Sequence, residues 1–353
     1  MIYMLHISDL HFVKNAQADI FEKILMEEAS KKVEGVCQGQ KLLIVTGDLH
    51  NFSDNNYEAA SSFLSRLVDS MGLNMTSDVF VVPGNHDVGN ETALESLLKD
   101  KDPDWKNHLK SSAYMLRKGD YSYTQERLRA FRTYSAFVCG LGIYDAAKEL
   151  DWPATTHMRT WEGTQRLNIL HLNTALIADG KEKANQMTDT NTAASLVNSW
   201  ASTSEAIPAI AIGHNNFFDL QQKQRDELAS IFSLGNICIY LCGDRHQYER
   251  NAEEQEIRLE SGYGKGKRIY NLAAAKAIAD RNDDFSEFGF SWHIWNEVTG
   301  EVTVELRKWR SDLRSSTIQD GETFTYYLYD KDTHDYGNIM VDPDFEQYIT
   351  TFA

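Results

Sequence analysis

The sequence has few cysteines and no long hydrophobic run. Its four cysteines are too sparse and too irregularly spaced for a secreted disulfide framework, so reduced thiols are expected. The apolar runs, such as 207–212, stop far short of the roughly 20 residues that a membrane-spanning helix needs. The N-terminal MIYMLHISDL has no basic start and reaches polar residues early, which is not typical of a signal peptide. We therefore expect a cytoplasmic protein without a membrane segment.

Basic residues are scarce relative to acidic ones. The 353-residue chain has 35 Lys and Arg against 52 Asp and Glu, a net charge of −17. Nucleic acid bound over the whole surface would need basic residues opposite its phosphates, so this balance argues against such binding but permits a local basic groove. Extensive disorder is excluded, because 7 Trp, 16 Tyr and 16 Phe are too many for a chain that fails to collapse.

Five short apolar runs are each followed by a small group of polar residues, and helical patterns lie between several of them. Apolar runs bounded by glycine are typical of strands buried on both faces, and strands that alternate with helices predict a mainly parallel sheet. Ligands bind beyond the carboxyl ends of such strands, so all five polar groups fall where a site is expected. The runs are 2–7, 42–45, 79–82, 209–212 and 237–241.

The polar groups combine carboxylates, imidazoles and one amide. Oxygen donors mixed with imidazole suit first-row divalent metals such as Mn, Fe or Zn. Seven donors exceed what one ion normally takes from a protein, but they match two ions that share one carboxylate. The seven are Asp9, His11, Asp48, Asn85, His214, Asp244 and His246.

The motifs HISDLH, TGDLH, PGNHD, GHN and GDRH resemble, in order, the five signature motifs of the calcineurin-like metallophosphoesterases. The resemblance covers roughly residues 2–250. It implies an α/β fold, a four-layer α/β/β/α sandwich in which two sheets lie between helices. It also implies hydrolysis of a phosphoester by two metal ions, with a hydroxide between them as the nucleophile.

The resemblance assigns ligands by matching position. Asp48 would bridge the two ions, and the other ligands divide between them: Asp9, His11 and His246 at one ion, Asn85 and His214 at the other.

Two further residues of the third motif resemble catalytic residues of the family. His86 corresponds to the residue that contacts the scissile phosphate and protonates or stabilises the leaving oxygen, and Asp87 would orient its ring. A carboxylate beside an imidazole is a usual way to hold one tautomer.

One position departs from the family pattern. Asp244 stands where the family usually has a histidine that binds the second metal. A carboxylate there favours harder ions, so we expect Mn²⁺, or Mg²⁺, over Zn²⁺, with Fe also compatible. The alternative is that Asp244 does not reach the metal and the second site is weak.

Other histidines are expected to be structural. His6 lies inside the first strand, where a structural hydrogen bond is favoured over metal binding. His50 is expected on a loop surface and His171 in the core.

The expected domain organisation is a catalytic domain at 1–310 with a C-terminal extension, 311–353, packed on it. Residues 88–165 predict a helical, aromatic-rich insertion that includes one amphipathic helix over 124–138. This insertion is either an ordinary packed segment or a lid whose arginines face phosphate. The strands between 268 and 309 are expected in the second sheet.

The preferred function is hydrolysis of a phosphodiester, with a nucleotide or single-stranded nucleic acid as substrate, because aromatic residues of the insertion could stack on bases. A phosphomonoesterase that acts on phosphoproteins or small metabolites is the alternative. A non-catalytic binding module with the same fold is a third possibility, distinguished by failure to hydrolyse esters despite bound metal.

Overall fold

The computed structural model describes most of the chain. The described residues are 1–12, 16–50, 57–145, 152–178, 186–201, 207–244, 256–258, 268–274, 289–309 and 318–327. Within these ranges, no helix combines the length and the apolar character needed to cross a membrane.

The first sheet is built around β1 (Ile2–Ile7). β1 is parallel to β2 (Lys41–Val45), which is parallel to β3 (Val79–Val81). Antiparallel strands continue the sheet from the other edge of β1, in the order β10 (Gly289–Trp295), β11 (Glu301–Trp309) and β12 (Ile318–Tyr327). The Met4–His293 pair aligns β1 with β10, so residues from the two ends of the chain lie side by side.

The second sheet has six strands in the order β4-β5-β6-β7-β9-β8. Its four central strands are parallel and its two edge strands antiparallel. The strands are β4 (His157–Glu162), β5 (Arg166–His171), β6 (Ala209–Ile212), β7 (Ile239–Cys242), β8 (Glu256–Arg258) and β9 (Arg268–Ala273).

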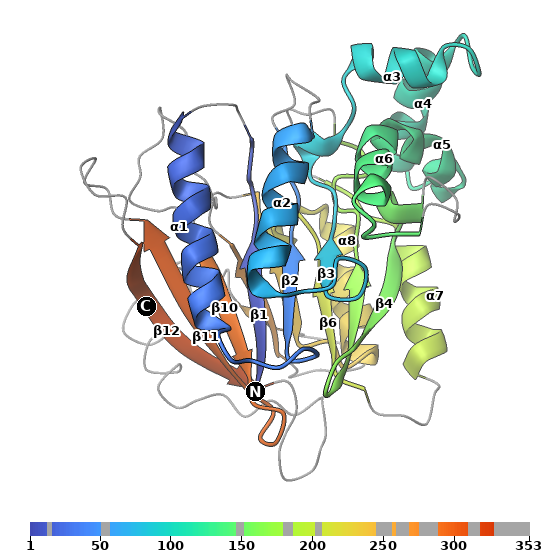
Figure 1. Cartoon of the computed structure of the whole chain (residues 1–353). Helices are drawn as coiled ribbons and strands as arrows, with labels where there is room; N and C mark the ends of the chain where they lie inside the picture. The colour runs from blue at the N-terminus through green and yellow to red at the C-terminus, as the bar shows by residue number, and fades with distance from the viewer. Residues whose placement is uncertain are drawn as a thin grey trace.

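Helices cover the outer face of each sheet (Figure 1). α1 and α2 pack on the first sheet, α7 and α8 on the second, and the remaining helices lie together between β3 and β4 in the chain. The helices are α1 (Ala16–Lys32), α2 (Glu58–Met71), α3 (Glu91–Leu98), α4 (Trp105–Arg117), α5 (Thr124–Leu128), α6 (Arg132–Gly140), α7 (Thr190–Ala201) and α8 (Gln222–Leu234).

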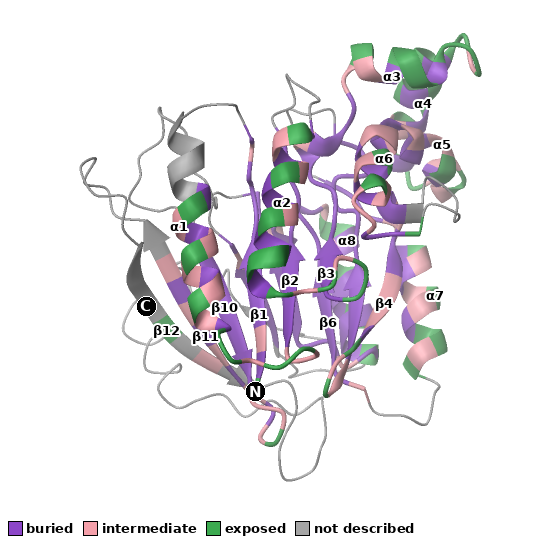
Figure 2. Ribbon diagram, in the orientation of Figure 1, coloured by how far each residue is buried: buried purple, intermediate pink, exposed green. Residues whose placement is uncertain are grey.

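Alternation along the strands divides the apolar residues between layers. In β1, Met4 contributes to the core between the sheets, whereas Leu5 packs under the helices of the first sheet. Ile210 and Ala211 of β6 divide in the same way between the central core and the layer under α8. Figure 2 shows the result, with buried strands and helices whose outward faces are exposed. The four-layer α/β/β/α sandwich implied by the sequence is confirmed.

The predicted strand positions agree closely with the structure for the first motifs, but one sheet assignment is wrong. Of the strands between 268 and 309, only β9 lies in the second sheet, whereas β10 and β11 extend the first sheet beside β1. The edge of β1 opposite β2 would otherwise present unpaired backbone groups, and β10 covers it.

The helical segment between β3 and β4 differs in detail from the prediction. The single helix expected at 124–138 is divided into α5 and α6 by a short 3₁₀ segment, Arg129–Phe131, in which Phe131 is fully buried. The end of the 88–165 range forms β4 rather than helix. β12 lies within the 311–353 range and adds an edge strand, while residues 328–353 lie outside the described part of the chain. The domain boundaries themselves stay predictions.

Candidate metal centre

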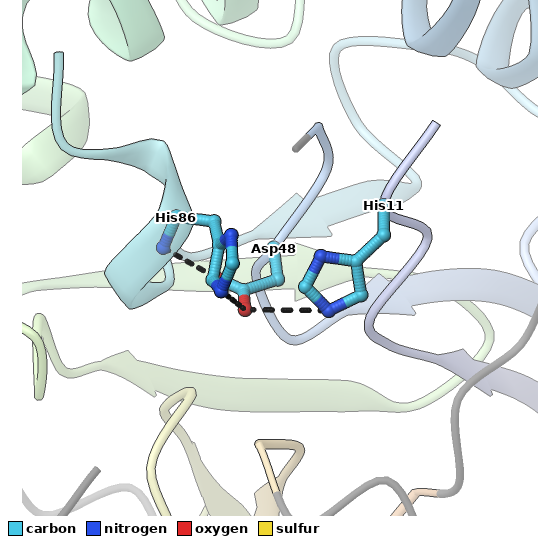
Figure 3. A group of neighbouring side chains, drawn as sticks. All are labelled: His11, Asp48 and His86. Atoms are coloured by element: carbon cyan, nitrogen blue, oxygen red, sulfur yellow. Dashed lines mark hydrogen bonds and ion pairs between the residues drawn. The ribbon is translucent and has the colours of Figure 1, made fainter. Parts of the chain in front are cut away.

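The polar groups that follow the strands of both sheets converge on one carboxylate. Asp48, which follows β2, is 1% exposed. Its Oδ2 atom lies 3.6 Å from His11 Nε2, 3.9 Å from His86 Nε2 and 3.3 Å from His214 Nε2. Figure 3 shows His11 and His86 on either side of this carboxylate. Residues from three strand ends of the first sheet and one of the second therefore meet at Asp48.

Two groups of possible metal ligands share this carboxylate. In one group the donor atoms of His11, Asp48 and His86 lie within 4.8 Å of one another, and in the other those of Asp9, Asp48 and His214 do so. Asp48 is common to both groups, whereas Asp9 falls in the group of His214 rather than that of His11. The bridging role of Asp48 and the division of the ligands stay predictions.

The remaining predicted ligands surround His214. Its Nε2 atom lies 2.9 Å from Oδ1 of Asn85 and 3.6 Å from Oδ1 of Asp244. The other Asp244 oxygen accepts a hydrogen bond from Nδ2 of Asn215 at 3.0 Å, and the Asp244 N–H donates to Asp9 Oδ2 at 3.1 Å. Asp244 therefore lies among the donor atoms, although its ligation stays a prediction.

The seventh predicted ligand cannot be placed. His246 and the neighbouring Arg245 lie outside the described residues.

The hydrogen bond of His214 Nδ1 determines what the other ring nitrogen, Nε2, can bind. His214 Nδ1 lies 2.7 Å from the carbonyl oxygen of Thr46, to which it can only donate. In a neutral ring, Nε2 would then direct its lone pair at the carboxylates of Asp48 and Asp244. The lone pair and the negatively charged carboxylate oxygens would repel each other. A proton or a cation beside Nε2 removes this repulsion, so the donor set fits a positively charged group between the rings and the carboxylates.

The backbone carries strain at the same residues. Among the described residues, five non-glycine residues have positive φ, and four of them are predicted ligands: Asp9 (φ 53°), His11 (φ 40°), Asp48 (φ 52°) and Asp244 (φ 67°). Such conformations cost on the order of 1–3 kcal/mol each and gather at functional sites. Here they turn the chain sharply after each strand and bring the side chains together.

Glycines allow the loops to approach one another. A Cβ atom on Gly84 would lie 2.1 Å from Oδ1 of Asp48 and 2.5 Å from its backbone nitrogen. A Cβ atom on Gly243 would lie 1.9 Å from Ser8 Oγ and 2.6 Å from Asp9 Oδ2. The glycines of the PGNHD and GDRH motifs therefore leave the space that the carboxylates occupy.

The charged groups of the site shift one another's pKa values. Burial acts to raise the pKa of Asp48, but His214, together with His11 and His86, outweighs it and holds that pKa well below its usual value. Burial acts to lower the pKa of His214, and the carboxylates of Asp48, Asp244 and Asp9 instead raise it well above its usual value. Without a metal ion, these carboxylates and imidazoles therefore favour a proton on His214 beside an ionised Asp48.

His86 differs from the other members in its exposure and protonation. Its side chain is 25% exposed, and its ring meets the ring of His11 edge to face at 4.6 Å. Its backbone N–H donates to Asp48 Oδ1 at 2.8 Å. Burial lowers the pKa of His86 to about 4, against the opposing effect of Asp48. This low pKa favours a neutral ring near pH 7.

The contacts of the Asp87 carboxylate join two loops. Its oxygens accept hydrogen bonds from the backbone N–H groups of Gly84 at 2.8 Å and Asp48 at 2.9 Å, and from the hydroxyl of Tyr57 at 3.0 Å. Its expected role in orienting the ring of His86 stays a prediction.

Three described histidines outside the ligand set, His6, His50 and His171, have clear surroundings. Nε2 of His6 lies 2.9 Å from the hydroxyl of Thr46, and His171 is fully buried, so the expected structural roles are confirmed. The prediction that His50 lies on a loop surface is wrong, because its side chain is buried with its ring 4.2 Å from that of Tyr57. His50 pairs in an isolated β-bridge with Phe12, which holds it beside the segment that follows β1.

The arginines of the helical segment contact protein groups. Arg127 donates to the backbone carbonyls of Leu176 and Ala178, and Arg129 forms ion pairs with Asp102 and with a neighbouring glutamate. These contacts match the packed alternative for this segment better than a lid whose arginines face phosphate.

Supporting residues that sequence reasoning missed lie outside the ligand positions. The hydroxyl of Thr174 accepts from the backbone N–H groups of His214 and Asn215, at 3.0 and 2.9 Å, and the carbonyl of Thr46 holds the His214 ring. Thr46 stands within TGDLH, so its position was a usable signal, whereas Thr174 and Tyr57 belong to no motif.

Comparisons with known proteins identify a family and a relative. The family model described as calcineurin-like phosphoesterase matches residues 2–248. The metallophosphoesterase-like protein YydB of Bacillus subtilis (strain 168) is 23% identical over 374 residues, covering 99% of this chain and 71% of that protein.

Two solved structures align over most of the chain. Vps29 of Chaetomium thermophilum has a TM-score of 0.36 and 11% identity, and covers 92% of this chain and 97% of its own. A 5'-nucleotidase precursor of Thermus thermophilus has a TM-score of 0.38 and 12% identity, and covers 100% of this chain and 58% of its own.

Proposed function

The chain belongs to the calcineurin-like phosphoesterase family, and we propose from this that it hydrolyses phosphoester bonds with two divalent metal ions. The observation that carries the proposal is the sharing of Asp48 by two groups of donor atoms. When bound, the two ions would polarise the phosphoryl group and acidify a water molecule. The chain's own residues would hold the ions, orient the phosphate and handle the proton of the leaving group.

We assign the ligands to two sides of Asp48. His214 has its Nδ1–H held by Thr46, so its Nε2 is available to a metal in a fixed orientation. In the proposed arrangement, one ion takes Asp9, His11, Asp48 and His246, and the other takes Asp48, Asn85, His214 and Asp244.

We assign His86 to the leaving group. Its position beside Asp48 and its partial exposure support contact with a bound phosphoester. A neutral imidazole can bind the phosphate through an N–H. The negative charge of a bound phosphoester would raise the pKa of His86, so that the ring takes up a proton from solvent and can pass it to the departing oxygen.

We propose Mn²⁺ as the metal, with Mg²⁺ next, because three carboxylates contribute to the centre. Metal analysis of the purified protein beside an Asp244→Ala variant tests the assignment of Asp244. We expect wild-type protein to hold two ions and the variant to lose one of them. Full occupancy of both sites in the variant would exclude Asp244 as a ligand.

We propose a phosphodiester as the preferred substrate class, with a nucleotide or single-stranded nucleic acid as the natural form. The support is the set of tyrosines on the helical segment, where Tyr114 is 59% exposed and Tyr121 and Tyr123 are partly exposed. Arg127 and Arg129 add no support, because both are engaged with protein groups.

Hydrolysis of matched aryl phosphates tests the reaction and the substrate class together. We expect Mn²⁺-loaded protein to cleave a bis(aryl) phosphate diester faster than the aryl monoester. Preference for the monoester would favour a phosphomonoesterase instead. Failure to cleave either ester with two ions bound would favour a non-catalytic binding protein.

A further inference from the structure

A tyrosine outside the five motifs contacts the carboxylate that joins two loops of the centre. Tyr57 lies immediately before α2 and is 9% exposed. Its hydroxyl donates to Oδ1 of Asp87 at 3.0 Å, while Oδ2 of Asp87 accepts from the N–H groups of Gly84 and Asp48. Oδ1 also accepts from the N–H of Leu49 at 3.3 Å, so the Asp87 carboxylate is held by the Tyr57 hydroxyl together with backbone groups of the loops after β2 and β3.

The ring of Tyr57 is itself fixed by aromatic neighbours. It stacks on Phe137 of α6 with ring centroids 4.4 Å apart and an interplanar angle of 18°. The ring of His50 meets it edge to face at 4.2 Å and 81°. Phe137 of the helical segment therefore helps to fix the ring whose hydroxyl contacts the Asp87 carboxylate.

The position of Asp87 matters because Asp48 holds a strained conformation. Asp48 has a φ of 52°, and its N–H donates to Asp87 while its carbonyl accepts from the N–H of His11 at 3.0 Å. A shift of this backbone would move the carboxylate that faces three imidazoles and accepts from the N–H of His86. The hydrogen bond to Asp87 therefore bears directly on the geometry of the centre.

We propose that Tyr57 is a positioning residue of the metal centre: through Asp87 its hydroxyl sets the backbone of Asp48, and α6 sets Tyr57. The helical segment then contributes to metal binding without supplying a ligand. This inference rests on the proposed function for the identity of the ligands, but its test needs no hydrolysis.

The test compares Tyr57→Phe with Tyr134→Phe. Tyr57→Phe keeps both ring contacts and removes only the hydroxyl. Tyr134, on α6, is a matched control because it is also buried and its hydroxyl has no hydrogen-bond partner within the described structure. Mn²⁺ affinity is measured by titration calorimetry, and the absorption spectrum of the Co²⁺-loaded protein reports ligand geometry.

We expect Tyr57→Phe to weaken Mn²⁺ binding about tenfold or more, as is typical for residues that orient a ligand, and to shift the Co²⁺ spectrum. Tyr134→Phe should leave both unchanged. Unchanged Mn²⁺ affinity and an unchanged Co²⁺ spectrum in Tyr57→Phe would overturn the proposal.

A double variant separates positioning from a general loss of stability. In an Asp87→Asn background, Tyr57→Phe should have little further effect on affinity, because the hydroxyl acts through that carboxylate. Fully additive losses would also overturn the proposal. If neither the wild type nor any variant cleaves an aryl ester while the affinities follow this order, the proposed function fails and the role of Tyr57 stands.

Discussion

Replacing Asp48 by asparagine should weaken Mn²⁺ binding by about a thousandfold. The Asp48 carboxylate lies within 3.9 Å of the ring nitrogens of His11, His86 and His214, so it is the charge common to both donor groups. A pair of unit charges about 4 Å apart interacts by about 4 kcal/mol at an effective dielectric constant of about 20. Because each 1.4 kcal/mol changes an equilibrium constant about tenfold, the expected loss is about three orders of magnitude.

Titration calorimetry with Mn²⁺ measures this loss directly. Asp78→Asn is the control, because Asp78 is a buried carboxylate that precedes β3, at the end of the strand opposite PGNHD. Circular dichroism establishes that both variants fold. If folded Asp48→Asn protein binds Mn²⁺ within tenfold of the wild type, the centre needs no shared carboxylate and the expectation is refuted.

Three other variants probe the leaving-group residue, the packing and the protonation of the protein. His86→Ala should lower kcat by about 10² to 10⁴ in aryl ester hydrolysis while Mn²⁺ content stays unchanged, and wild-type turnover would contradict its assignment. Gly84→Ala should abolish Mn²⁺ binding and lower the melting temperature, because its Cβ would lie 2.1 Å from Asp48 Oδ1; normal binding would mean that the loops can separate at little cost. Burial lowers the pKa of His293 to about 3, so between that pH and about 6.5 the unfolded chain binds the proton and stability is lost as the pH falls. The free energy of unfolding, measured with urea, should therefore fall less between pH 7 and pH 5 for His293→Leu than for the wild type. Equal slopes of this free energy against pH would indicate that the histidine is protonated in the folded protein.

Local patterns in the sequence were sufficient for the strands that carry the motifs. The predicted bounds of β1 and β6 are those found, because an apolar run followed by glycine or a short polar group marks a buried strand and its end. Parallel strands present their carboxyl ends at one edge of a sheet, which brings Asp9 and Asp48 of the first sheet to the same edge. The approach of His214 to Asp48 depends in addition on how the second sheet packs on the first.

The features that the sequence did not predict depend on contacts between residues distant in the chain. The pairing of β10 with β1 joins residues nearly 290 positions apart, and no local pattern distinguishes it from addition to the second sheet. Tyr57 lies 30 residues before Asp87, and only the folded positions of α2 and α6 make it a partner of that carboxylate. Thr46 stands within a motif, but its support of His214 is a backbone contact, and the identity of its side chain does not specify that contact.

The candidate centre draws Asp9, Asp48 and Asn85 from the first sheet and His214 and Asp244 from the second. During synthesis the first set leaves the ribosome more than 100 residues before the second, so an early fragment has only half of the coordination set. Ions bound later would link the two halves of the sandwich. Removal of the ions by a chelator should therefore lower the melting temperature, and the whole molecule should still unfold in one cooperative transition.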